Sequence, residues 1–215
     1  MKDIAIFGAG GFGKEVACLI NSINDVKPTW NFIGFFDDGK DIGEQVSHFG
    51  KVLGGVSELL QYANGLSVVI AIGNPNTVYK IVSVLNHNEN LLFPNLIHPQ
   101  VNFSDIDSLE MGIGNIVQRG SSFSCDINIG DFNVINANVA FGHDDNIGSY
   151  NTFMPGVKIS GEVRMADSNF FGVGSIVLQQ IRIGNNIRLG AGSVLMTKPK
   201  DSTLYIGNPA KKFQF

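Results

Sequence analysis

His143 stands in the run 142–145 (Gly-His-Asp-Asp), where two carboxylates directly follow an imidazole. A carboxylate beside an imidazole fixes its tautomer and raises its basicity, which suits a general base. Cys125 and Asp126 lie 18 residues before His143 and Asp144. A cysteine near a histidine could instead be a nucleophile with the histidine as its base. A solvated histidine without catalytic duty is the simplest alternative.

A second candidate site begins at the run 8–13 (Gly-Ala-Gly-Gly-Phe-Gly). This is a complete G-x-G-x-x-G motif between an expected strand at 3–7 and an expected helix at 14–23. Its glycines allow backbone N–H groups to approach a phosphate at the helix N-terminus. Gly10, Gly11 and Phe12 are the candidates for that contact. The alternative is a glycine turn that only shapes the backbone.

Three further residues follow expected strands of the same unit. Asp37 and Asp38 come after a strand at 32–36, about 24 residues beyond Gly13, where such folds keep an acidic residue for the ribose or base. Gly73 follows a strand at 68–72, where the backbone could approach a ligand closely. All three are candidates for substrate binding.

The elements that carry these residues amount to one mononucleotide-sized α/β unit. Strands at 52–54 and 96–97 and helices at 57–62 and 77–85 complete it. A dinucleotide site needs two such halves, so an NAD-dependent oxidoreductase is a disfavoured alternative. We expect residues 1–98 to form a half-Rossmann parallel sheet domain that binds the phosphates of a nucleotide-linked substrate.

His143 belongs to a different unit, in which an apolar residue recurs every six positions. Period six indicates short strands that turn a corner, and three sides make a coil of about 18 residues that stacks into a parallel β-helix. Residues 18 apart then lie at roughly the 4.8 Å spacing of neighbouring strands. We expect residues 99–215 to form this β-helix, with a tail at 198–215 that its prolines and glycine keep from regular structure. The expected inward residues are Met111, Val117, Phe123, Ile129, Ile135, Phe141, Ile147, Phe153, Ile159, Met165, Phe171, Val177, Ile183, Leu189 and Leu195.

Composition excludes several classes of function. The 215-residue chain has a net charge of −4 and no cluster of Lys and Arg, so we expect no nucleic-acid partner. No apolar run could span a membrane, and the run 4–8 is too short for a signal peptide. Cys18 and Cys125 fall in different expected domains, which supports neither a disulfide framework nor a zinc site. We expect a cytoplasmic protein without a metal.

Several motifs occur in a fixed order along nearly the whole chain. As an ordered set, they resemble the hexapeptide-repeat sugar acyltransferases of the sialic acid O-acetyltransferase and bacillosamine-type N-acetyltransferase family. The resemblance implies a left-handed β-helix, acetyl-CoA as the acyl donor and a homotrimer with active sites between subunits. The motifs are the glycine loop with Lys14, Phe36-Asp37-Asp38, Ala71-Ile72-Gly73-Asn74, Leu96-Ile97-His98-Pro99, the hexads, Gly142-His143-Asp144 and Gly207-Asn208-Pro209-Ala210-Lys211.

The resemblance also implies roles for single residues. In that family, the corner histidine is the general base and the acidic residue after it tunes the base, which gives these roles to His143 and Asp144. The family often has the longer Glu at the second of these positions. Nine residues beyond the base, where the family often has a second histidine, this chain has Thr152. The other implied acetyl-CoA contacts are Gly156, Val173, Gly174 and Ala191 in a groove between two prisms, and Ile206, Pro209 and Lys211 in the tail.

Two more expectations follow, one from the 18-residue spacing of the coils and one from the inward register. Gly161 lies one coil beyond His143, so its N–H is a candidate to stabilise an oxyanion. Phe132 and Phe170 lie outside the inward register, and we expect them to pack between protomers.

Our functional hypothesis is an N-acetyltransferase that acts on a 4-amino-4,6-dideoxyhexose linked to UDP or dTDP, with direct transfer from acetyl-CoA and His143 as the base. O-acetylation of sialic acid or another surface-glycan sugar is the close alternative. From a different class, the chain could be a non-catalytic trimeric scaffold that binds the sugar nucleotide and not acetyl-CoA.

Overall fold

The computed structural model describes residues 1–213, so Gln214 and Phe215, the end of the expected tail, lie outside the described residues. The chain divides into two compact units, Met1–Pro99 and Gln100–Phe215. Among residues 1–213, no helix has both the length and the apolar character needed to cross a membrane.

The first unit is a mainly parallel sheet with the strand order β3-β4-β2-β1-β5-β6. β1 pairs in parallel with β2 and β5, and only β3 runs antiparallel to its neighbour β4. The strands and helices expected before residue 90 are present, and their ends differ by a few residues. The strand expected at 96–97 forms as β7, but it is not part of this sheet. The elements of the unit are β1 (Lys2–Phe7), α1 (Gly11–Val26), β2 (Trp30–Phe36), β3 (Gln45–Val46), β4 (Gly50–Gly54), α2 (Val56–Leu60), β5 (Leu66–Ile70), α3 (Pro75–Leu85), β6 (Leu91–Leu92) and β7 (Leu96–Ile97).

The sequence of α1 accounts for its buried face and for the residue at which it begins. α1 buries Val16, Ala17, Leu19 and Ile20, whose spacing places them on one helix face. The helix begins at Gly11, three residues earlier than expected, because a first helical turn needs no N–H partners and therefore tolerates the glycines of the loop.

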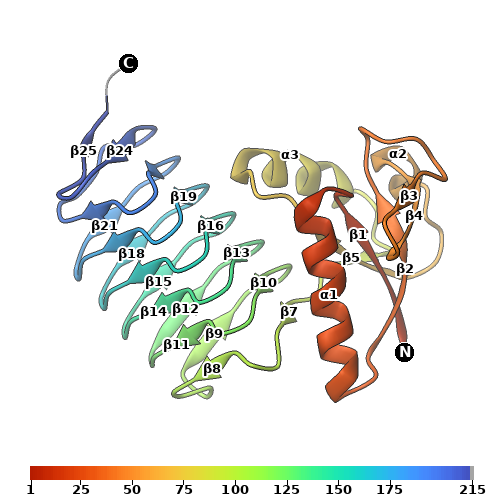
Figure 1. Ribbon diagram of the computed structural model, residues 1–215, viewed down its shortest axis with the longest axis horizontal. Helices are drawn as coiled ribbons and strands as arrows, with labels where there is room; N and C mark the ends of the chain where they lie inside the picture. The colour runs from red at the N-terminus through yellow and green to blue at the C-terminus, as the bar shows by residue number, and fades with distance from the viewer. Residues whose placement is uncertain (214–215) are drawn as a thin grey trace. The chain divides into compact units, whose positions relative to one another are not determined.

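The second unit is a parallel β-helix whose three faces the chain visits in turn (Figure 1). The first face contains β10 (Ile116–Val117), β13 (Val134–Ile135), β16 (Thr152–Phe153), β19 (Phe170–Phe171), β22 (Arg188–Leu189), β24 (Leu204–Ile206) and β25 (Lys211–Lys212). The second face contains β8 (Asn102–Phe103), β11 (Ser122–Phe123), β14 (Ala140–Phe141), β17 (Lys158–Ile159), β20 (Ile176–Val177) and β23 (Val194–Leu195). The third face contains β9 (Leu109–Met111), β12 (Ile127–Ile129), β15 (Asn146–Ile147), β18 (Arg164–Met165) and β21 (Arg182–Ile183).

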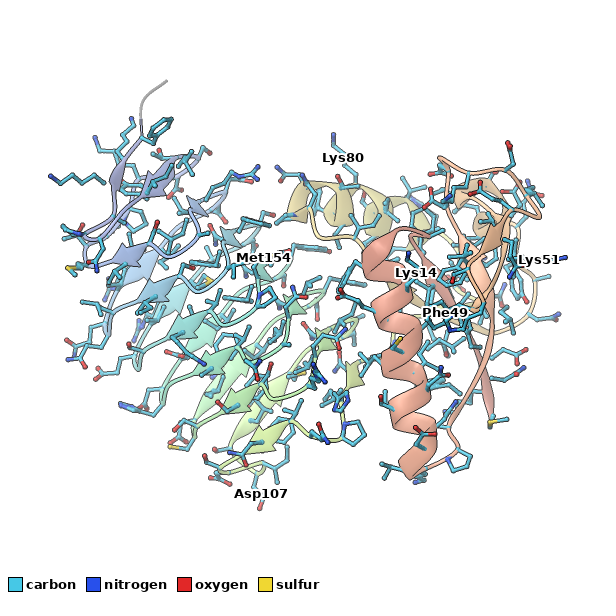
Figure 2. The ribbon with its side chains drawn as sticks, in the orientation of Figure 1. Lys14, Phe49, Lys51, Lys80, Asp107 and Met154 are labelled. Atoms are coloured by element: carbon cyan, nitrogen blue, oxygen red, sulfur yellow. The ribbon has the colours of Figure 1, made fainter. Side chains whose placement is uncertain are left out.

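The interior of the β-helix is the predicted apolar stack. Paired residues are 18 apart, and every expected inward residue from Val117 to Leu195 is buried. The aromatic residues contact one another: the Phe153 ring stacks on the Phe171 ring at 5.1 Å between ring centres and meets the Phe141 ring edge to face at 5.1 Å. Charged side chains such as Asp107 and Lys51 extend from the surfaces of their units (Figure 2).

A second inward position lies two residues before each apolar residue, and in one row it is occupied by asparagine. Asn115, Asn133, Asn151 and Asn169 are all fully buried. The side-chain oxygen of each accepts the N–H of the residue 18 positions later, at 2.7–2.9 Å. We call this row the asparagine ladder. It satisfies buried backbone donors that the apolar stack cannot reach.

Two expectations about the β-helix are wrong. The tail is not irregular: β24 pairs in parallel with β22 and antiparallel with β25, because its prolines lie outside both strands. Phe132 does not need another protomer to cover it, because the ring is buried in its own chain and stacks on Tyr150 at 5.6 Å. Its backbone adopts a left-handed conformation, with φ at +53°.

The aromatic stack should be a large source of stability. Phe153→Ala should lower the free energy of unfolding by about 3–5 kcal/mol, because the side chain is fully buried and a cavity would remain. Denaturant unfolding followed by circular dichroism measures this change. Ile42→Ala, at a side chain that is 69 % exposed, is the control and should change it by less than about 0.5 kcal/mol. A loss below about 1 kcal/mol for Phe153→Ala would contradict the packing described here.

Candidate active site

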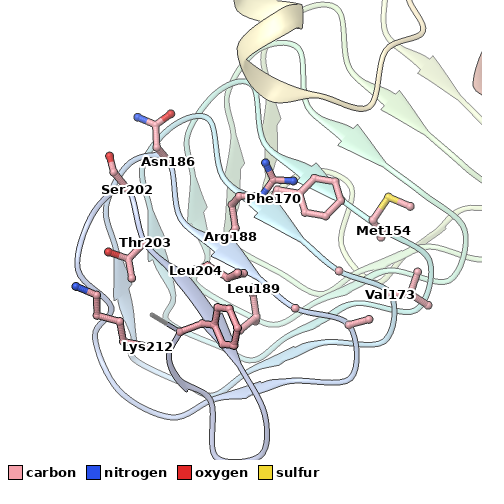
Figure 3. A pocket seen from close by; sticks show the side chains of 14 residues that line it. Met154, Phe170, Val173, Asn186, Arg188, Leu189, Ser202, Thr203, Leu204 and Lys212 are labelled. Atoms are coloured by element: carbon pink, nitrogen blue, oxygen red, sulfur yellow. The ribbon is translucent and has the colours of Figure 1, made fainter. Parts of the chain in front are cut away.

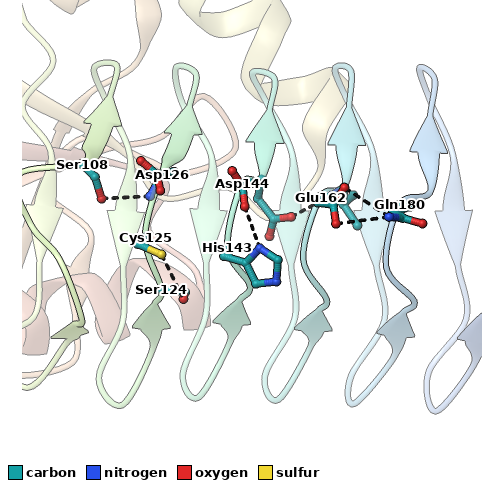
Figure 4. Close-up of polar contacts among 10 residues, drawn as sticks. Ser108, Ser124, Cys125, Asp126, His143, Asp144, Glu162 and Gln180 are labelled. Carbon is teal, nitrogen blue, oxygen red and sulfur yellow. Dashed lines mark hydrogen bonds and ion pairs between the residues drawn. The ribbon is translucent and has the colours of Figure 1, made fainter.

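The turns that join the second face to the third form a row that we call the histidine corner, comprising residues 124–126, 142–144, 160–162 and 178–180. His143 projects from this corner, and its Nδ1 lies 2.7 Å from Oδ2 of Asp144 (Figure 4). Asp144 reaches the imidazole despite its short side chain because its backbone is left-handed, with φ at +58°, a region that Asp tolerates. A carboxylate only accepts, so Nδ1 carries the hydrogen in this pair and Nε2 keeps its lone pair.

The surrounding charges favour the protonated imidazole. The hydrogen bond to Asp144 raises the pKa of His143 above its ordinary value, and the negative charges of Asp144, Glu162 and Asp145 act in the same direction. Partial desolvation opposes them and is the weaker effect overall. The result is a more basic imidazole, as expected for a group that takes a proton from a substrate.

Gly161 lies directly against the imidazole from the next coil. A Cβ atom added to Gly161 would be 2.7 Å from Nε2 of His143, so no larger residue fits there without displacing the ring. The absence of a side chain also leaves the histidine corner without a capping group at this coil.

The neighbouring corner, between the third and first faces, shows what such capping looks like. There, the side chains of Asp131, Ser149, Asp167 and Asn185 each accept the backbone N–H of the residue 18 positions earlier, at 2.7–3.0 Å. By the same rule, a side chain at position 161 would cap the N–H of His143, and Gly161 has none. Among residues 1–213, the N–H of Gly161 itself has no hydrogen-bond partner either.

Cys125 lies one coil before His143 on the same corner, as the stacking arithmetic expects. Its sulfur accepts a weak hydrogen bond from the Ser124 hydroxyl at 3.9 Å. The imidazole nitrogen Nδ1 is already bonded to Asp144. The geometry thus pairs the histidine with the carboxylate and not with the thiol.

Two arginines beside this corner were missed by the sequence analysis. Arg164 and Arg182 pair in register on the third face and line a hollow of about 480 Å³ together with Asp144, Glu162 and Gln180. Glu162 already accepts from the Gln180 side chain at 3.2 Å, and within the described chain no ion pair involves either arginine. Their 18-residue spacing was the available signal, because it places like charges on adjacent strands.

A larger cavity of about 850 Å³ lies on the first face (Figure 3). Its walls include Phe170, with the Arg188 guanidinium 5.2 Å from the ring centre, and the strand that carries Lys212. Two of the expected cofactor residues, Val173 and Ala191, line it, and His143 does not. His143 and this cavity therefore belong to different edges of one prism.

The other expected cofactor residues vary in position. Gly156 and Gly174 both have positive φ on the corner that carries Val173. Ile206, Pro209 and Lys211 are exposed in and after β24. Thr152 is buried, so its hydroxyl is a poor candidate for a cofactor contact.

The glycine loop of the first unit has room for a ligand. A Cβ atom at Gly10, Gly11 or Gly73 would meet no atom within 4 Å, whereas one at Gly13 would lie 2.0 Å from the carbonyl oxygen of Gly8. The first three glycines thus leave open space, and Gly13 permits the close approach of helix and strand. Phe12 is half-buried at the first turn of α1.

The two aspartates after β2 have backbone partners. Asp37 accepts from the N–H of Ala9 at 2.7 Å and from that of Gly39 at 2.9 Å. Asp38 accepts from the N–H of Val56 at 2.8 Å, at the start of α2. They lie beside the loop as expected, and each shapes a backbone segment. Among residues 1–213, no group of three or more His, Cys, Asp or Glu side chains is placed to hold a metal.

Asp144 should control the protonation of His143. Asp144→Asn should lower the pKa of His143, because the largest cause of its increase is the hydrogen bond to the carboxylate. An NMR titration of the imidazole signals measures this directly. An unchanged His143 titration would show that the pair does not form.

Comparisons with known proteins agree with this architecture. Residues 3–85 match the family model of the PglD N-terminal domain. Among curated proteins, no sequence match is found.

Solved structures match over nearly the whole chain. The acetyltransferase domain of PglB from Neisseria gonorrhoeae FA1090, in complex with acetyl coenzyme A, has 27 % identity and a TM-score of 0.88 over 99 % of both chains. WeeI from Acinetobacter baumannii AYE has 28 % identity and a TM-score of 0.86 over 99 % of this chain and 100 % of its own. PerB from Caulobacter crescentus, in complex with CoA and GDP-perosamine, has 27 % identity and a TM-score of 0.85 over 100 % of this chain and 98 % of its own.

The family match, the β-helix and the similarity to the acetyltransferase domain of PglB agree with one another. Residues 3–85 thus match the PglD N-terminal domain, and the chain as a whole is an acyltransferase with a β-helix that is similar to PglB and PerB.

Proposed function

We propose that this acyltransferase moves the acetyl group of acetyl-CoA to the amine of a nucleotide-linked 4-amino-4,6-dideoxyhexose. One observation carries the proposal: His143, held by Asp144, presents Nε2 against the backbone of Gly161, whose N–H has no partner among the described residues. A base and an amide donor side by side are what acyl transfer to a nucleophile needs. The complexes of PglB with acetyl coenzyme A and of PerB with CoA and GDP-perosamine support the choice of substrates.

The mechanism follows from these two groups. The sugar amine attacks the thioester carbonyl while Nε2 of His143 takes the proton that the nitrogen loses. The carbonyl oxygen becomes an oxyanion, to which the N–H of Gly161 donates a hydrogen bond. The C–S bond then breaks, and the imidazolium returns its proton to the leaving CoA sulfur. Holding both substrates in place supplies much of the remaining rate enhancement.

Acetyl-CoA would occupy the cavity on the first face, near Val173 and Ala191. Because this cavity does not include His143, a single chain is an incomplete site. A second copy that brings its own cavity edge against the histidine corner would complete it, and a closed trimer provides three equivalent sites of this kind. Phe170, half-buried at the cavity wall, would then lie near the boundary between copies.

The nucleotide would bind at the first unit. Gly10, Gly11 and Gly73 leave space for it, and the first N–H groups of α1 can receive a phosphate. Asp37 and Asp38 keep their backbone bonds and shape this loop, so nucleoside recognition would depend on their remaining lone pairs.

Arg164 and Arg182 would bind a phosphate group of one substrate beside the catalytic base. Two in-register cations repel each other unless an anion lies between them, and Arg binds phosphate oxygens through a planar pair of donors. The hollow that they line is open to such a group.

Two alternatives differ in what they predict. An O-acetyltransferase of a sialic-acid-like sugar would use the same base on a hydroxyl. A trimeric scaffold would bind the sugar nucleotide without acetyl-CoA, and the paired His143 and Asp144 argue for the enzyme because a scaffold has no use for a raised imidazole basicity.

A thiol-release assay with acetyl-CoA tests the function. We expect release with UDP-, dTDP- or GDP-linked 4-amino sugars and none with free sialic acid. His143→Ala should reduce kcat by about 10²–10⁴-fold, because positioned general-base catalysis contributes that much. His87→Ala, at an exposed histidine near the end of α3, is the matched control and should retain full activity.

Release with free sialic acid alone would favour O-acetylation. If isothermal titration detected the sugar nucleotide but no acetyl-CoA, the scaffold would replace the enzyme as the explanation.

The arginine pair makes a second prediction. The double variant Arg164→Gln/Arg182→Gln should raise KM for one of the two substrates by about tenfold or more, since charge-assisted bonds contribute about 1.5–3 kcal/mol each. The substrate whose KM rises, acetyl-CoA or the sugar nucleotide, is the one that carries the phosphate bound by the two arginines. Lys51→Gln removes a charge from an exposed site on β4 and should leave both KM values unchanged. If neither KM of the double variant changed by more than about threefold, no phosphate would bind there.

A further inference from the structure

Asp145 is the first residue after the histidine corner whose side chain points into the β-helix. It occupies the second inward position, where the equivalent residues of the other coils are Ile127, Val163 and Ile181. The Asp145 side chain is completely buried, like those aliphatic residues. Burying an ionised carboxylate is costly, so a carboxyl at an aliphatic position requires a specific explanation.

The two oxygens of Asp145 differ in their environments. Oδ1 accepts the N–H of Val163 at 2.9 Å, which joins Asp145 to the coil that carries Gly161. Oδ2 is buried and has no partner among the described residues. Burial raises the pKa of Asp145 to about 7, although the backbone N–H groups of Val163 and Gly142 and the charge of His143 act in the opposite direction.

The asparagine ladder shows how a neutral polar side chain forms hydrogen bonds at a second inward position. Asn169 accepts the N–H of Ile187 through its oxygen and donates from its nitrogen to the carbonyl of Ala166, three residues earlier. A protonated Asp145 has the same pair of functions: Oδ1 accepts, and Oδ2 carries a hydrogen. The carbonyl three residues before Asp145 belongs to Gly142, which directly precedes His143.

We propose that Asp145 is a positioning residue that works as a neutral acid and ties the His143 corner to the Gly161 segment from inside the β-helix. This role rests on the proposed function, in which His143 is the base and Gly161 the oxyanion donor. Asp145 touches neither substrate. It sets the distance between the two groups that do, because its hydrogen bond crosses from one coil to the next.

Several charged or titratable groups surround Asp145. His143 and Asp144 lie on its own corner, Cys125 and Asp126 on the coil before it, and Glu162 and Arg164 on the coil after it. The negative charge of Asp144 disfavours a second negative charge beside it, which agrees with a neutral Asp145.

Stability against pH tests the neutral acid without any substrate. A carboxyl with a higher pKa in the folded than in the unfolded chain costs stability as the pH rises from its unfolded to its folded value. For Asp145 this window runs from about 3.8 to about 7. Asp145→Asn keeps the shape of the side chain and cannot ionise, so its Tm should exceed that of the wild type. The difference in Tm should grow by about 5 °C or more across this pH range and stay constant at higher pH.

Kinetics test the positioning role. Asp145→Asn should retain kcat within about threefold at pH 7, because the amide can accept the N–H of Val163 and donate from its nitrogen. Asp145→Val matches the aliphatic residues of the other coils and should fold, yet lower kcat by about tenfold or more with little change in either KM. Asn133→Val removes an equivalent interior bond at the neighbouring corner, between the third and first faces, and should lower Tm while leaving kcat unchanged.

The following outcomes would contradict the inference. A pH-independent Tm difference, or a loss of kcat in Asp145→Asn as large as that in Asp145→Val, would show that the charged form is the working one. Full kcat in Asp145→Val, or an equal loss in Asn133→Val, would remove the positioning role. If the wild type released no thiol with any sugar, the proposed function would fail, whereas the Tm comparison would still decide whether Asp145 is neutral.

Discussion

In-register pairing of residues 18 apart is the constraint on which the second unit depends. Each strand is only two or three residues long, so a single strand pair contributes little, and stability comes from coils that stack on both sides. The same pairing lines up chemically equivalent positions into rows. A row of apolar residues makes the core, a row of asparagines satisfies buried amides, and a row of corner positions carries the site. The candidate functional residues of this unit are therefore those that differ in type from the other members of their row.

The histidine corner is a row that lacks the side-chain caps of the neighbouring corner. At the neighbouring corner, every coil from Ile113 to Asp167 has its amide capped by a side chain from the next coil. At the histidine corner, Gly161 has no side chain to cap the N–H of His143, and it leaves enough space for the imidazole. In the proposed reaction, this one glycine would supply both room for the base and an N–H that has no partner among the described residues. Asp144 and Asp145 adjust the same corner from outside and from inside.

The sequence predicted what depends on short-range pattern and on stacking. Period six fixed the inward residues, and the adjacency of His143 and Asp144 ensured their contact. It did not predict that Asp37 and Asp38 bind backbone N–H groups, because carboxylates at the end of a strand suit a loop as well as a ribose. The strands of the tail and the burial of Phe132 were missed because both depend on neighbours a full coil away. Arg164 and Arg182 were recognisable from their spacing, and the interior position of Asp145 was not, since an inward carboxyl contradicts the apolar pattern.

The asparagine ladder has a consequence for how the chain finds its winding. Since every hexad offers an apolar residue, a coil displaced by one hexad would still fill the core. It would, however, set a buried carboxamide against the serine, valine or isoleucine of a neighbouring row, and an unsatisfied buried amide costs about 1–3 kcal/mol. Asn115, Asn133, Asn151 and Asn169 therefore select the register of the coils, because only one of several nearly equivalent windings lets each of their side-chain oxygens accept a backbone N–H from the next coil.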